Sequence, residues 1–215
     1  MSRVAKLGDR AVRVARPPGS DASRLLELVR GWPGVIDAIV TEAWIGVYYD
    51  RAAPDLATVP FASLEAASAP PARARRTIEL VVRYDGPDLA EVAGEVGLSP
   101  GEVARLHQSA EYEVSFLGFL PGFAYLAGLP ERLVVPRRST PRPRVPKNAV
   151  AIAGPYTGVY PFASPGGWRL VGTLVDVEVR AASSLERAAP VPPELFSAEG
   201  ALLRAGDRVR FRSAE

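Results

Sequence analysis

The sequence EVSFLGFLPGFAYLAGL, residues 113–129, decides the fold class of this 215-residue chain. It is a series of short apolar strands that glycine and proline interrupt, at Gly118, Pro121-Gly122 and Gly128. Similar segments continue as far as Val209-Arg210-Phe211. Many short strands with such punctuation are typical of a β-sandwich or a β-barrel. We therefore predict a β domain for the second part of the chain.

The first part of the chain has a different pattern, which predicts a small α/β domain. Asp21 can cap a helix that runs from about Ala22 to Arg30. Apolar runs rich in β-branched and aromatic residues predict strands at Ala11–Val14, Val35–Val40 and Trp44–Tyr49. A helix packed on such strands would form a compact unit of its own.

A segment from Ala62 to Arg76 separates the two patterns, and it contains small residues, prolines and arginines with little periodicity. Such segments bury little surface and commonly connect domains. We therefore expect an N-terminal α/β domain over residues 1–76, with the linker at its end, and a C-terminal domain over residues 77–215. Together they make an α+β protein.

The segment LAEVAGEVGLSPGEVARL, residues 89–106, imitates a helix-turn-helix motif. Apolar residues at helical spacing predict two helices, the first ending at Gly97 and the second opening on a capping box of Ser99 and Glu102. A recognition helix presents polar side chains near its N-terminus to base edges. Here that position is Pro100-Gly101-Glu102, which has no donor side chain and one negative charge. We expect no nucleic-acid partner.

The composition limits the classes of function. A formal net charge of +2 is too small for a general binder of polyanions. Because the chain has no cysteine and one histidine, we expect no disulfide, no cysteine nucleophile and no metal site. No stretch approaches the length of an apolar membrane span, and the N-terminus lacks an apolar signal segment. A cytoplasmic protein without membrane contact is expected.

His107 is the only histidine, and it lies one turn after Val103 on the second predicted helix. This spacing predicts that it faces inward. A lone histidine commonly serves as a structural hydrogen-bonding group. It is also the only side chain here whose unperturbed pKa lies near neutrality, so a role in proton transfer is the alternative.

The segment PRRSTPRPRVP, residues 136–146, concentrates positive charge. It contains no acid, and its prolines keep it extended. Guanidinium groups pair with carboxylates and phosphates through two parallel hydrogen bonds. The segment is therefore a candidate anion site, with a solvated basic loop or a contact for a partner's acidic surface as alternatives. Its four arginines are Arg137, Arg138, Arg142 and Arg144.

A second loop rich in glycine, proline and aromatic residues is GPYTGVYPFASPGGW, residues 154–168. Its Tyr156, Tyr160 and Trp168 could line a pocket with their ring faces and polar ends. Both aromatic loops could equally be buried turns. No Gly-x4-Gly-Lys-Ser/Thr sequence occurs, so the chain is not a self-contained ATPase of the P-loop type.

Taken together, these segments resemble the family called KipI or allophanate hydrolase subunit 1. The family pattern has Leu-His before a strand, a GF-x-PGF-x-YL core, a PR…PR stretch and a TG-x-YP…SPGGW loop. The chain has them in the same order at Leu106-His107, Gly118–Leu126, Pro136–Arg142 and Thr157–Trp168. The N-terminal part agrees more loosely.

The resemblance implies a small N-terminal α/β domain followed by a cyclophilin-like β-barrel. It also implies one subunit of an ATP-dependent 5-oxoprolinase complex, a hydrolase that cleaves the lactam of 5-oxoproline to give glutamate. The implied partners are an allophanate hydrolase subunit 2-type protein and a LamB/YcsF-type subunit, with which ATP is shared.

On this hypothesis, Arg138 or Arg142 holds the anion of the substrate and His107 relays a proton. ATP could activate the lactam oxygen by phosphorylation, after which water attacks more easily. The substrate would then be walled by the two aromatic loops, through Phe119, Pro121, Gly122, Phe123, Tyr156, Tyr160 and Trp168.

The chain departs from the family pattern in three places. Tyr156 stands where the family usually has Gln, and Pro146–Val150 stands where it usually reads PAGSV. Gly172–Val175 lacks the Arg and Pro of the usual GRTP. The fold expectation is unaffected by these changes.

A different class of function is the alternative: a KipI-type binding protein that inhibits a sensor histidine kinase. Such a protein needs an exposed surface and no chemistry. Prolyl isomerase activity would rest on analogy with the cyclophilin fold alone.

Overall fold

The computed structural model describes residues 4–18, 20–66, 76–180, 194–198 and 200–214. The chain separates into two compact units, Met1–Ala74 and Arg75–Glu215. Of the predicted linker, the first residues belong to helix α2 (Phe61–Ala66), and residues 67–75 lie outside the described residues. The domain boundary and the independent folding of each unit remain predictions.

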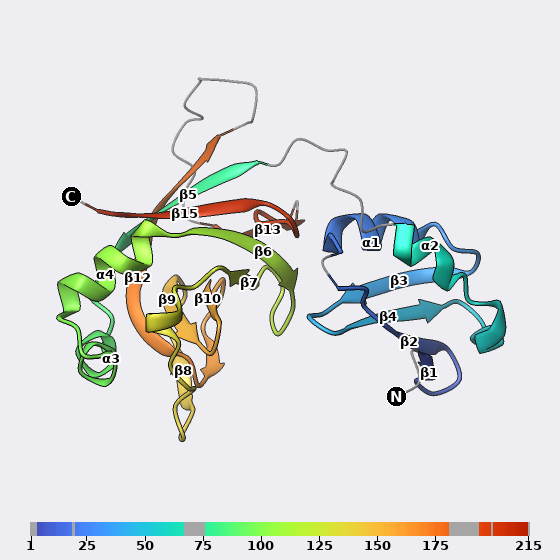
Figure 1. Ribbon diagram of the computed structural model, residues 1–215, viewed down its shortest axis with the longest axis horizontal. Coiled ribbons are helices and arrows are strands. Elements are labelled where there is room, and N and C mark those ends of the chain that lie inside the picture. Colours follow the sequence, from blue (N-terminus) through green and yellow to red (C-terminus); the bar gives the residue numbers. More distant parts are fainter. Residues whose placement is uncertain (1–3, 19, 67–75, 181–193, 199, 215) are drawn as a thin grey trace. The chain divides into compact units, whose positions relative to one another are not determined.

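The N-terminal unit is a four-stranded antiparallel sheet in the order β1-β2-β4-β3. Figure 1 shows α1 and α2 on one side of this sheet. The predicted cap of α1 is confirmed, since the Asp21 side chain accepts a hydrogen bond from the Arg24 N–H. The bounds are β1 (Val4–Lys6), β2 (Ala11–Ala15), α1 (Ala22–Arg30), β3 (Val35–Val40), β4 (Trp44–Tyr49) and the 3-10 helix η1 (Leu56–Thr58).

The second unit is built on a closed barrel of seven strands in the order β10-β7-β6-β15-β5-β12-β9. Neighbouring strands are antiparallel except for β15 and β5, which run parallel. The predicted α+β architecture with a C-terminal barrel is confirmed. The strands are β5 (Thr77–Arg83), β6 (Glu111–Leu117), β7 (Ala124–Ala127), β9 (Ala149–Ala153), β10 (Tyr156–Val159), β12 (Arg169–Arg180) and β15 (Arg208–Ser213).

Helices α3 (Leu89–Val96) and α4 (Pro100–Ser109) follow β5 and form the helical hairpin that the sequence predicts. Gly97 ends α3 in the left-handed conformation, with φ 64°, and the predicted capping box of Ser99 and Glu102 is present on α4. No helix in the described part of the chain is long and apolar enough to cross a membrane. The shorter elements are η2 (Glu131–Leu133), β8 (Arg142–Val145), β11 (Ser164–Gly166), β13 (Phe196–Ser197) and β14 (Gly200–Ala201).

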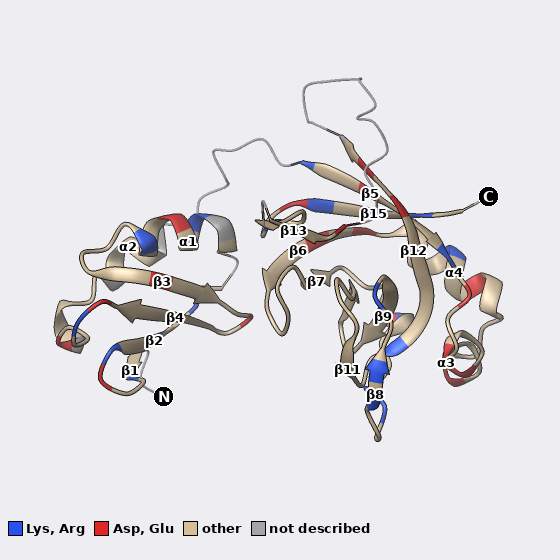
Figure 2. Cartoon of the chain, turned by 180° about the vertical axis from the view of Figure 1, so that it is seen from behind, with Lys and Arg blue, Asp and Glu red and all other residues tan. Residues whose placement is uncertain are grey.

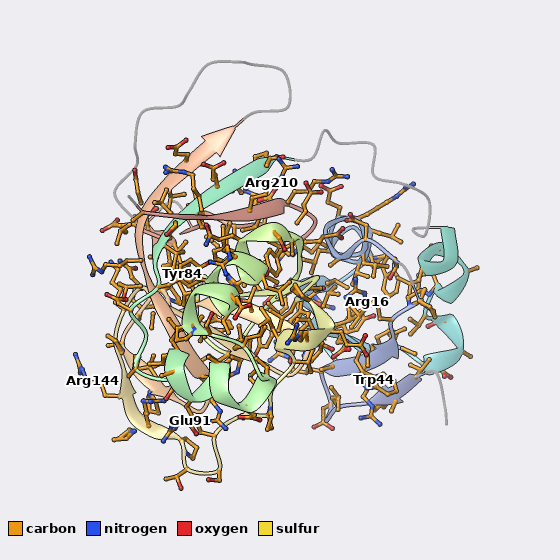
Figure 3. All side chains as sticks on the ribbon, turned by 60° about the vertical axis from the view of Figure 1, so that its left-hand side comes forward. Arg16, Trp44, Tyr84, Glu91, Arg144 and Arg210 are labelled. Carbon is orange, nitrogen blue, oxygen red and sulfur yellow. The ribbon has the colours of Figure 1, made fainter. Side chains whose placement is uncertain are left out.

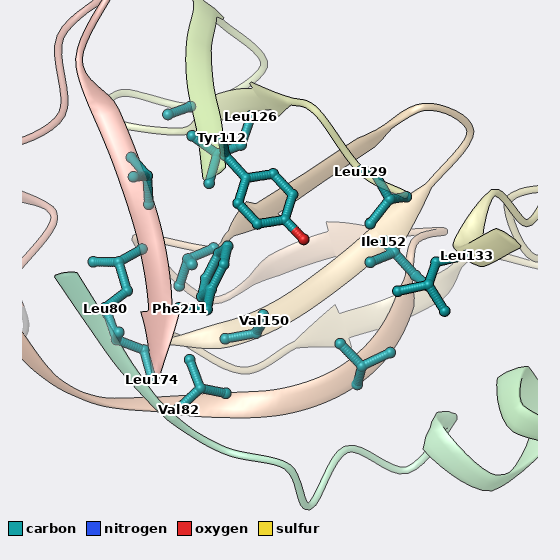
Figure 4. Close-up of a cluster of buried hydrophobic side chains, with 14 of the residues drawn as sticks. Leu80, Val82, Tyr112, Leu126, Leu129, Leu133, Val150, Ile152, Leu174 and Phe211 are labelled. Carbon is teal, nitrogen blue, oxygen red and sulfur yellow. The ribbon is translucent and has the colours of Figure 1, made fainter. Parts of the chain in front are cut away.

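The barrel wall has a different apolar cluster on each side. The larger cluster takes residues from all seven barrel strands, as well as from α3 and α4, and therefore fills the interior. Figure 4 shows part of it, with Tyr112 and Phe211 among aliphatic side chains. On β9, Val150 and Ile152 belong to this interior, whereas the alternate residues face a second cluster outside the wall. We call the second cluster the outer cluster, and its buried residues are Phe123, Val145, Ala149, Ala151, Ala153, Tyr160, Trp168 and Leu170.

Candidate functional site

His107 lies in the interior of the barrel unit, which confirms the inward orientation that its spacing predicts. It is 1% exposed, and its ring centroid lies 4.4 Å from that of Phe211. Its Nδ1 is 2.8 Å from the Tyr84 hydroxyl, and its Nε2 is 2.9 Å from Oγ1 of Thr157. Both ring nitrogens therefore have a partner.

The hydrogen bonds of Thr157 determine which nitrogen of His107 carries the proton. The Thr157 hydroxyl donates to the carbonyl oxygen of Ala151 at 3.0 Å, so it accepts the bond from His107 Nε2–H. The Tyr84 hydroxyl then donates to Nδ1. Burial lowers the pKa of His107 to about 3, so the ring is neutral near pH 7. The geometry is that of a structural group, and proton transfer by His107 stays a prediction.

Arg138 and Arg142 both pair with one buried carboxylate, that of Asp88. Oδ1 of Asp88 lies 3.0 Å from Arg138 Nη1 and 2.6 Å from Arg142 Nη2. Its Oδ2 accepts a hydrogen bond from the backbone N–H of Leu170 at 2.7 Å. Burial by itself would raise the pKa of Asp88, but these bonds and the two guanidinium charges hold it below its usual value. Asp88 thus ties the start of α3 to β8 and to β12.

Sequence reasoning missed Asp88, because the residue before a helix is ordinarily its cap. Its side chain makes no capping bond here and points away from α3 to the arginines. The available signal was indirect: a segment with four arginines and no acid must find its counter-charge elsewhere in the chain. Arg142 lies on β8 and neutralises a side chain that is 2% exposed.

The ion pairs extend along α3. Arg169 pairs with Glu91 and, at 3.4 Å, with Glu95, and Arg138 also reaches Glu91 at 3.5 Å. Figure 3 labels Glu91, which lies on α3. These acids balance the charges of the arginines that contact them. The segment is therefore anchored, rather than solvated, through two of its four arginines.

Arg137 and Arg144, the other two arginines of the segment, are exposed. Among the described residues no carboxylate pairs with either of them. Figure 2 shows basic residues gathered along β8, and Figure 3 shows Arg144 pointing away from the rest of the protein. Arg137 lies over the Trp168 ring instead, with Cζ 6.0 Å from the ring centroid. These two arginines are the ones whose charge is free to meet an anion.

The aromatic residues predicted to bind substrate come together in and around the outer cluster. The Phe123 ring lies 5.2 Å from that of Tyr160 and 5.3 Å from that of Trp168, both edge to face. Phe119 packs on Phe123 at 5.6 Å. Tyr156 joins through Tyr125, at 5.7 Å, and Tyr125 reaches Trp168 at 5.5 Å. Whether these rings contact a substrate stays a prediction.

The loop from Gly118 to Phe123 has a constrained backbone. Phe119 has φ 71°, which is unusual for a residue other than glycine, and its side chain is 58% exposed. Gly122 has φ 78°, and a Cβ atom there would lie 2.7 Å from Phe196 Cβ, so only glycine fits. Pro121 is exposed beside it. The loop therefore presents an aromatic ring at the surface from an unfavourable backbone conformation.

The structure shows how each of the three departures from the family pattern is accommodated. Asn148 stands where the family usually has the Gly of PAGSV, and its φ of 67° is one that asparagine tolerates better than most residues. Thr173 takes the place of the usual Arg and donates a hydrogen bond to Asp85 at 2.8 Å. Tyr156, in place of the usual Gln, adds a ring to the aromatic group. The barrel accepts all three changes.

The structure does not bring His107 to the predicted aromatic residues. Thr157, which holds His107, faces the interior from β10, and its neighbours Tyr156 and Gly158 face the other side. In the part of the chain that the structure describes, no three metal-ligating side chains gather. The candidate site is thus the outer cluster with the arginine segment beside it.

Comparison with known proteins gives a family match and named relatives. A family model described as the carboxyltransferase domain, subdomain C and D, matches residues 3–177. The B-type subunit of 5-oxoprolinase from Escherichia coli O157:H7 is 50% identical over 139 residues, which cover 63% of this chain and 57% of that protein. Its counterpart from Bacillus subtilis (strain 168) is 46% identical over 140 residues, covering 64% and 52%. The chain thus spans little more than half the length of these curated relatives.

Solved structures agree with the fold. The crystal structure of TTHA0988 has a TM-score of 0.74 and 37% identity, and the match covers 96% of this chain and 40% of that one. The K. lactis urea amidolyase has a TM-score of 0.61 at 16% identity, covering 98% of this chain and 15% of that one. The second likeness concerns the fold alone.

Proposed function

Because the chain belongs to the family of carboxyltransferase subdomains C and D, also called KipI or allophanate hydrolase subunit 1, we propose that it is a subunit of a 5-oxoprolinase. The complex would use ATP and water to open the lactam of 5-oxoproline and give glutamate. The single observation that carries this proposal is the 50% identity, over 139 residues, with a protein named as the B-type subunit of 5-oxoprolinase. The aromatic and arginine segments beside the barrel supply residues suited to a small anionic substrate.

The reaction needs an activated amide, because an unstrained lactam is a poor electrophile. Phosphate groups of ATP bind readily at helix N-termini that lack negative side chains. In this chain, α1 begins after Asp21, and Glu91 and Glu102 lie in the first turns of α3 and α4. These termini do not fit a triphosphate. We therefore assign ATP binding to the partner subunits.

What this chain would contribute is orientation of the substrate and exclusion of water. Buried rings of the outer cluster lower the local dielectric constant and so strengthen a charge-assisted hydrogen bond to a substrate carboxylate. The predicted partners are an allophanate hydrolase subunit 2-type protein and a LamB/YcsF-type subunit. We place the complex in the cytoplasm, where ATP is available.

Reconstitution tests the proposal. The chain should co-elute with the subunit 2-type protein in size-exclusion chromatography at micromolar concentration. With the LamB/YcsF-type subunit added, the mixture should release glutamate from 5-oxoproline in step with ATP hydrolysis, and omission of any one component should abolish this. Separate elution and no turnover would reject the proposal. Tight binding to a sensor histidine kinase without turnover would indicate the KipI-type inhibitor instead.

A further inference from the structure

The four arginines of residues 136–146 differ in what already neutralises them. Arg138 and Arg142 share the carboxylate of Asp88, which is 2% exposed. A substrate carboxylate at either of them would have to compete with a buried charge that is already in place. Arg137 and Arg144 carry no such partner among the described residues. Arg138 Nε and Arg142 Nη1 are buried without a hydrogen-bond partner among the described residues, but Asp88 already balances the charge of both guanidinium groups. Arg137 and Arg144 are therefore the arginines of this segment whose charge is most available to an anion.

Arg137 differs from Arg144 in its surroundings. Its guanidinium lies over the Trp168 ring, and Trp168 packs on Tyr125 and Phe123. Burial raises the pKa of the Tyr125 hydroxyl, and the nearby Arg137 charge counteracts that rise. Arg137 acts in the same sense on the pKa of Tyr160. Its charge is thus at the edge of the outer cluster, whereas Arg144 points away from the protein (Figure 3).

We propose that Arg137 binds the carboxylate of a small planar ligand whose ring rests against the partly exposed aromatic residues around Tyr125. On the proposed function, on which this inference rests, the ligand is 5-oxoproline, a flat lactam ring that carries one carboxylate. The guanidinium offers two parallel N–H donors to that carboxylate. The guanidinium lies over the Trp168 ring, with Cζ 6.0 Å from the ring centroid, a distance at which the ring face attracts the positive charge. Asp88 holds Arg138 and Arg142, which keeps the neighbouring backbone in place.

The arrangement also explains why one arginine of an adjacent pair would bind and the other would not. Residues 137 and 138 follow one another, but their side chains contact different groups. Arg138 turns to Asp88, and its backbone N–H donates to the Gly167 carbonyl at 2.7 Å. Arg137 is left on the side of Trp168. The segment thus has one anchoring arginine and one available arginine at its start.

Calorimetric titration of the isolated 215-residue chain tests the proposal. Wild-type chain should bind 5-oxoproline, and Arg137→Ala should raise the dissociation constant by about 10- to 100-fold, the loss of one charge-assisted pair. Arg137→Lys should restore little, since an ammonium lacks the planar fork. Arg144→Ala is the matched control: it removes the same charge from the same segment and should leave the dissociation constant unchanged.

A ligand without the carboxylate completes a thermodynamic cycle. Wild-type chain should bind 2-pyrrolidinone as weakly as Arg137→Ala binds 5-oxoproline, and Arg137→Ala should then weaken 2-pyrrolidinone little further. Competition with inorganic phosphate distinguishes a site specific for 5-oxoproline from a general oxyanion site. At equal concentration, phosphate should not displace 5-oxoproline. Displacement by phosphate, equal losses in Arg137→Ala and Arg144→Ala, or no binding by the wild-type chain would each overturn the proposal.

The outcome is separable from that of the proposed function. If the reconstituted complex turns over 5-oxoproline while the isolated chain binds none, the site assignment fails and the subunit assignment stands. If the chain binds 5-oxoproline through Arg137 and the complex releases no glutamate, the site assignment stands and the subunit assignment fails. Melting temperatures of Arg137→Ala and Arg144→Ala should match that of the wild type, which shows that a change in binding is not a loss of fold.

Discussion

On β10, neighbouring residues face two environments that differ in charge and in exposure. Thr157 faces the barrel interior, where it forms part of a hydrogen-bonded group with His107 and Tyr84. Tyr156 faces the outer side, toward Tyr125. Inside, the described polar atoms of this group are paired, and the histidine is neutral. Outside, rings and guanidinium groups remain partly exposed to solvent.

The difference teaches that residue type alone is a poor guide to a site. The only histidine of the chain is the usual first candidate for proton transfer, yet it lies where water and substrate have little access. The arginine that is best placed to meet a ligand stands next to one that serves as an anchor. What distinguishes them is the partner that each has found, and partners come from distant parts of the chain.

The largest expected effect concerns the anchor. Asp88→Asn removes the charge that two guanidinium groups and the Leu170 N–H share, and we expect it to lower the free energy of unfolding by about 3 kcal/mol. The measurement is urea unfolding, monitored by the fluorescence of Trp168. The other two tryptophans, Trp32 and Trp44, are replaced by Phe so that the signal comes from Trp168 alone. Arg137→Ala in the same assay should change stability by less than about 0.5 kcal/mol. Equal losses of stability in Asp88→Asn and Arg137→Ala would contradict the distinction between the arginines that Asp88 anchors and the available Arg137.

Next in size is the hydrogen-bonded group in the interior. His107→Leu leaves the Tyr84 hydroxyl and Thr157 without their partner, and the expected loss is about 2 kcal/mol. His107→Gln, whose amide can both donate and accept, should lose less. If His107 is structural, a complex reconstituted with the His107→Gln variant should still turn over 5-oxoproline under conditions in which the variant is folded. Abolished turnover in a folded His107→Gln would instead support proton transfer by this residue.

The pH dependence of stability should follow the same histidine. The unfolded chain takes up a proton at His107 near its ordinary pKa of 6.5, whereas the folded chain does so only at about pH 3. Between these values the unfolded state binds more protons, so stability falls as the pH falls, by up to about 1.4 kcal/mol per pH unit. Urea unfolding at a series of pH values from neutrality down through the ordinary pKa measures this slope. His107→Leu should flatten it, and an unchanged slope would assign it to other groups.

The smallest expected effect tests the strained surface loop. Phe119 has φ 71°, where glycine is free of the penalty that other residues meet. Phe119→Gly and Phe119→Ala both remove the ring, but the glycine variant should be the more stable by about 1 kcal/mol. Thermal unfolding of the two variants gives the difference directly. If they unfold at the same temperature, the backbone at this position is not strained in solution.

Local patterns predicted much of the fold. The strands Val35–Val40 and Trp44–Tyr49, the cap at Asp21 and the capping box at Ser99 are all where the sequence places them. Each depends on neighbours within a few residues, which the sequence states directly. The three-residue strand Val4–Lys6 was not predicted, because it is a strand through its pairing with β2 and not through a pattern of its own residues.

The candidate site could be predicted only in part. The aromatic loops were recognisable as unusual, and their rings do gather. Which arginine meets which acid could not be predicted, since Asp88 is separated from Arg138 by 50 residues and from Arg142 by 54. Periodicity tells which face of an element a residue occupies, but the contact of two such elements is decided by the closure of the whole barrel.

That closure depends on a single late strand. β15 (Arg208–Ser213) lies between β5 (Thr77–Arg83) and β6 (Glu111–Leu117). The first strand of the barrel therefore gains its second neighbour only when the last strand has been made. During synthesis on the ribosome, β5 and β6 therefore emerge with edges that nothing in the barrel yet covers, and such edges can pair with other chains. The barrel becomes a sealed cylinder only after β15 has left the ribosome. A nascent chain of this protein should accordingly be a client for chaperones that bind extended segments.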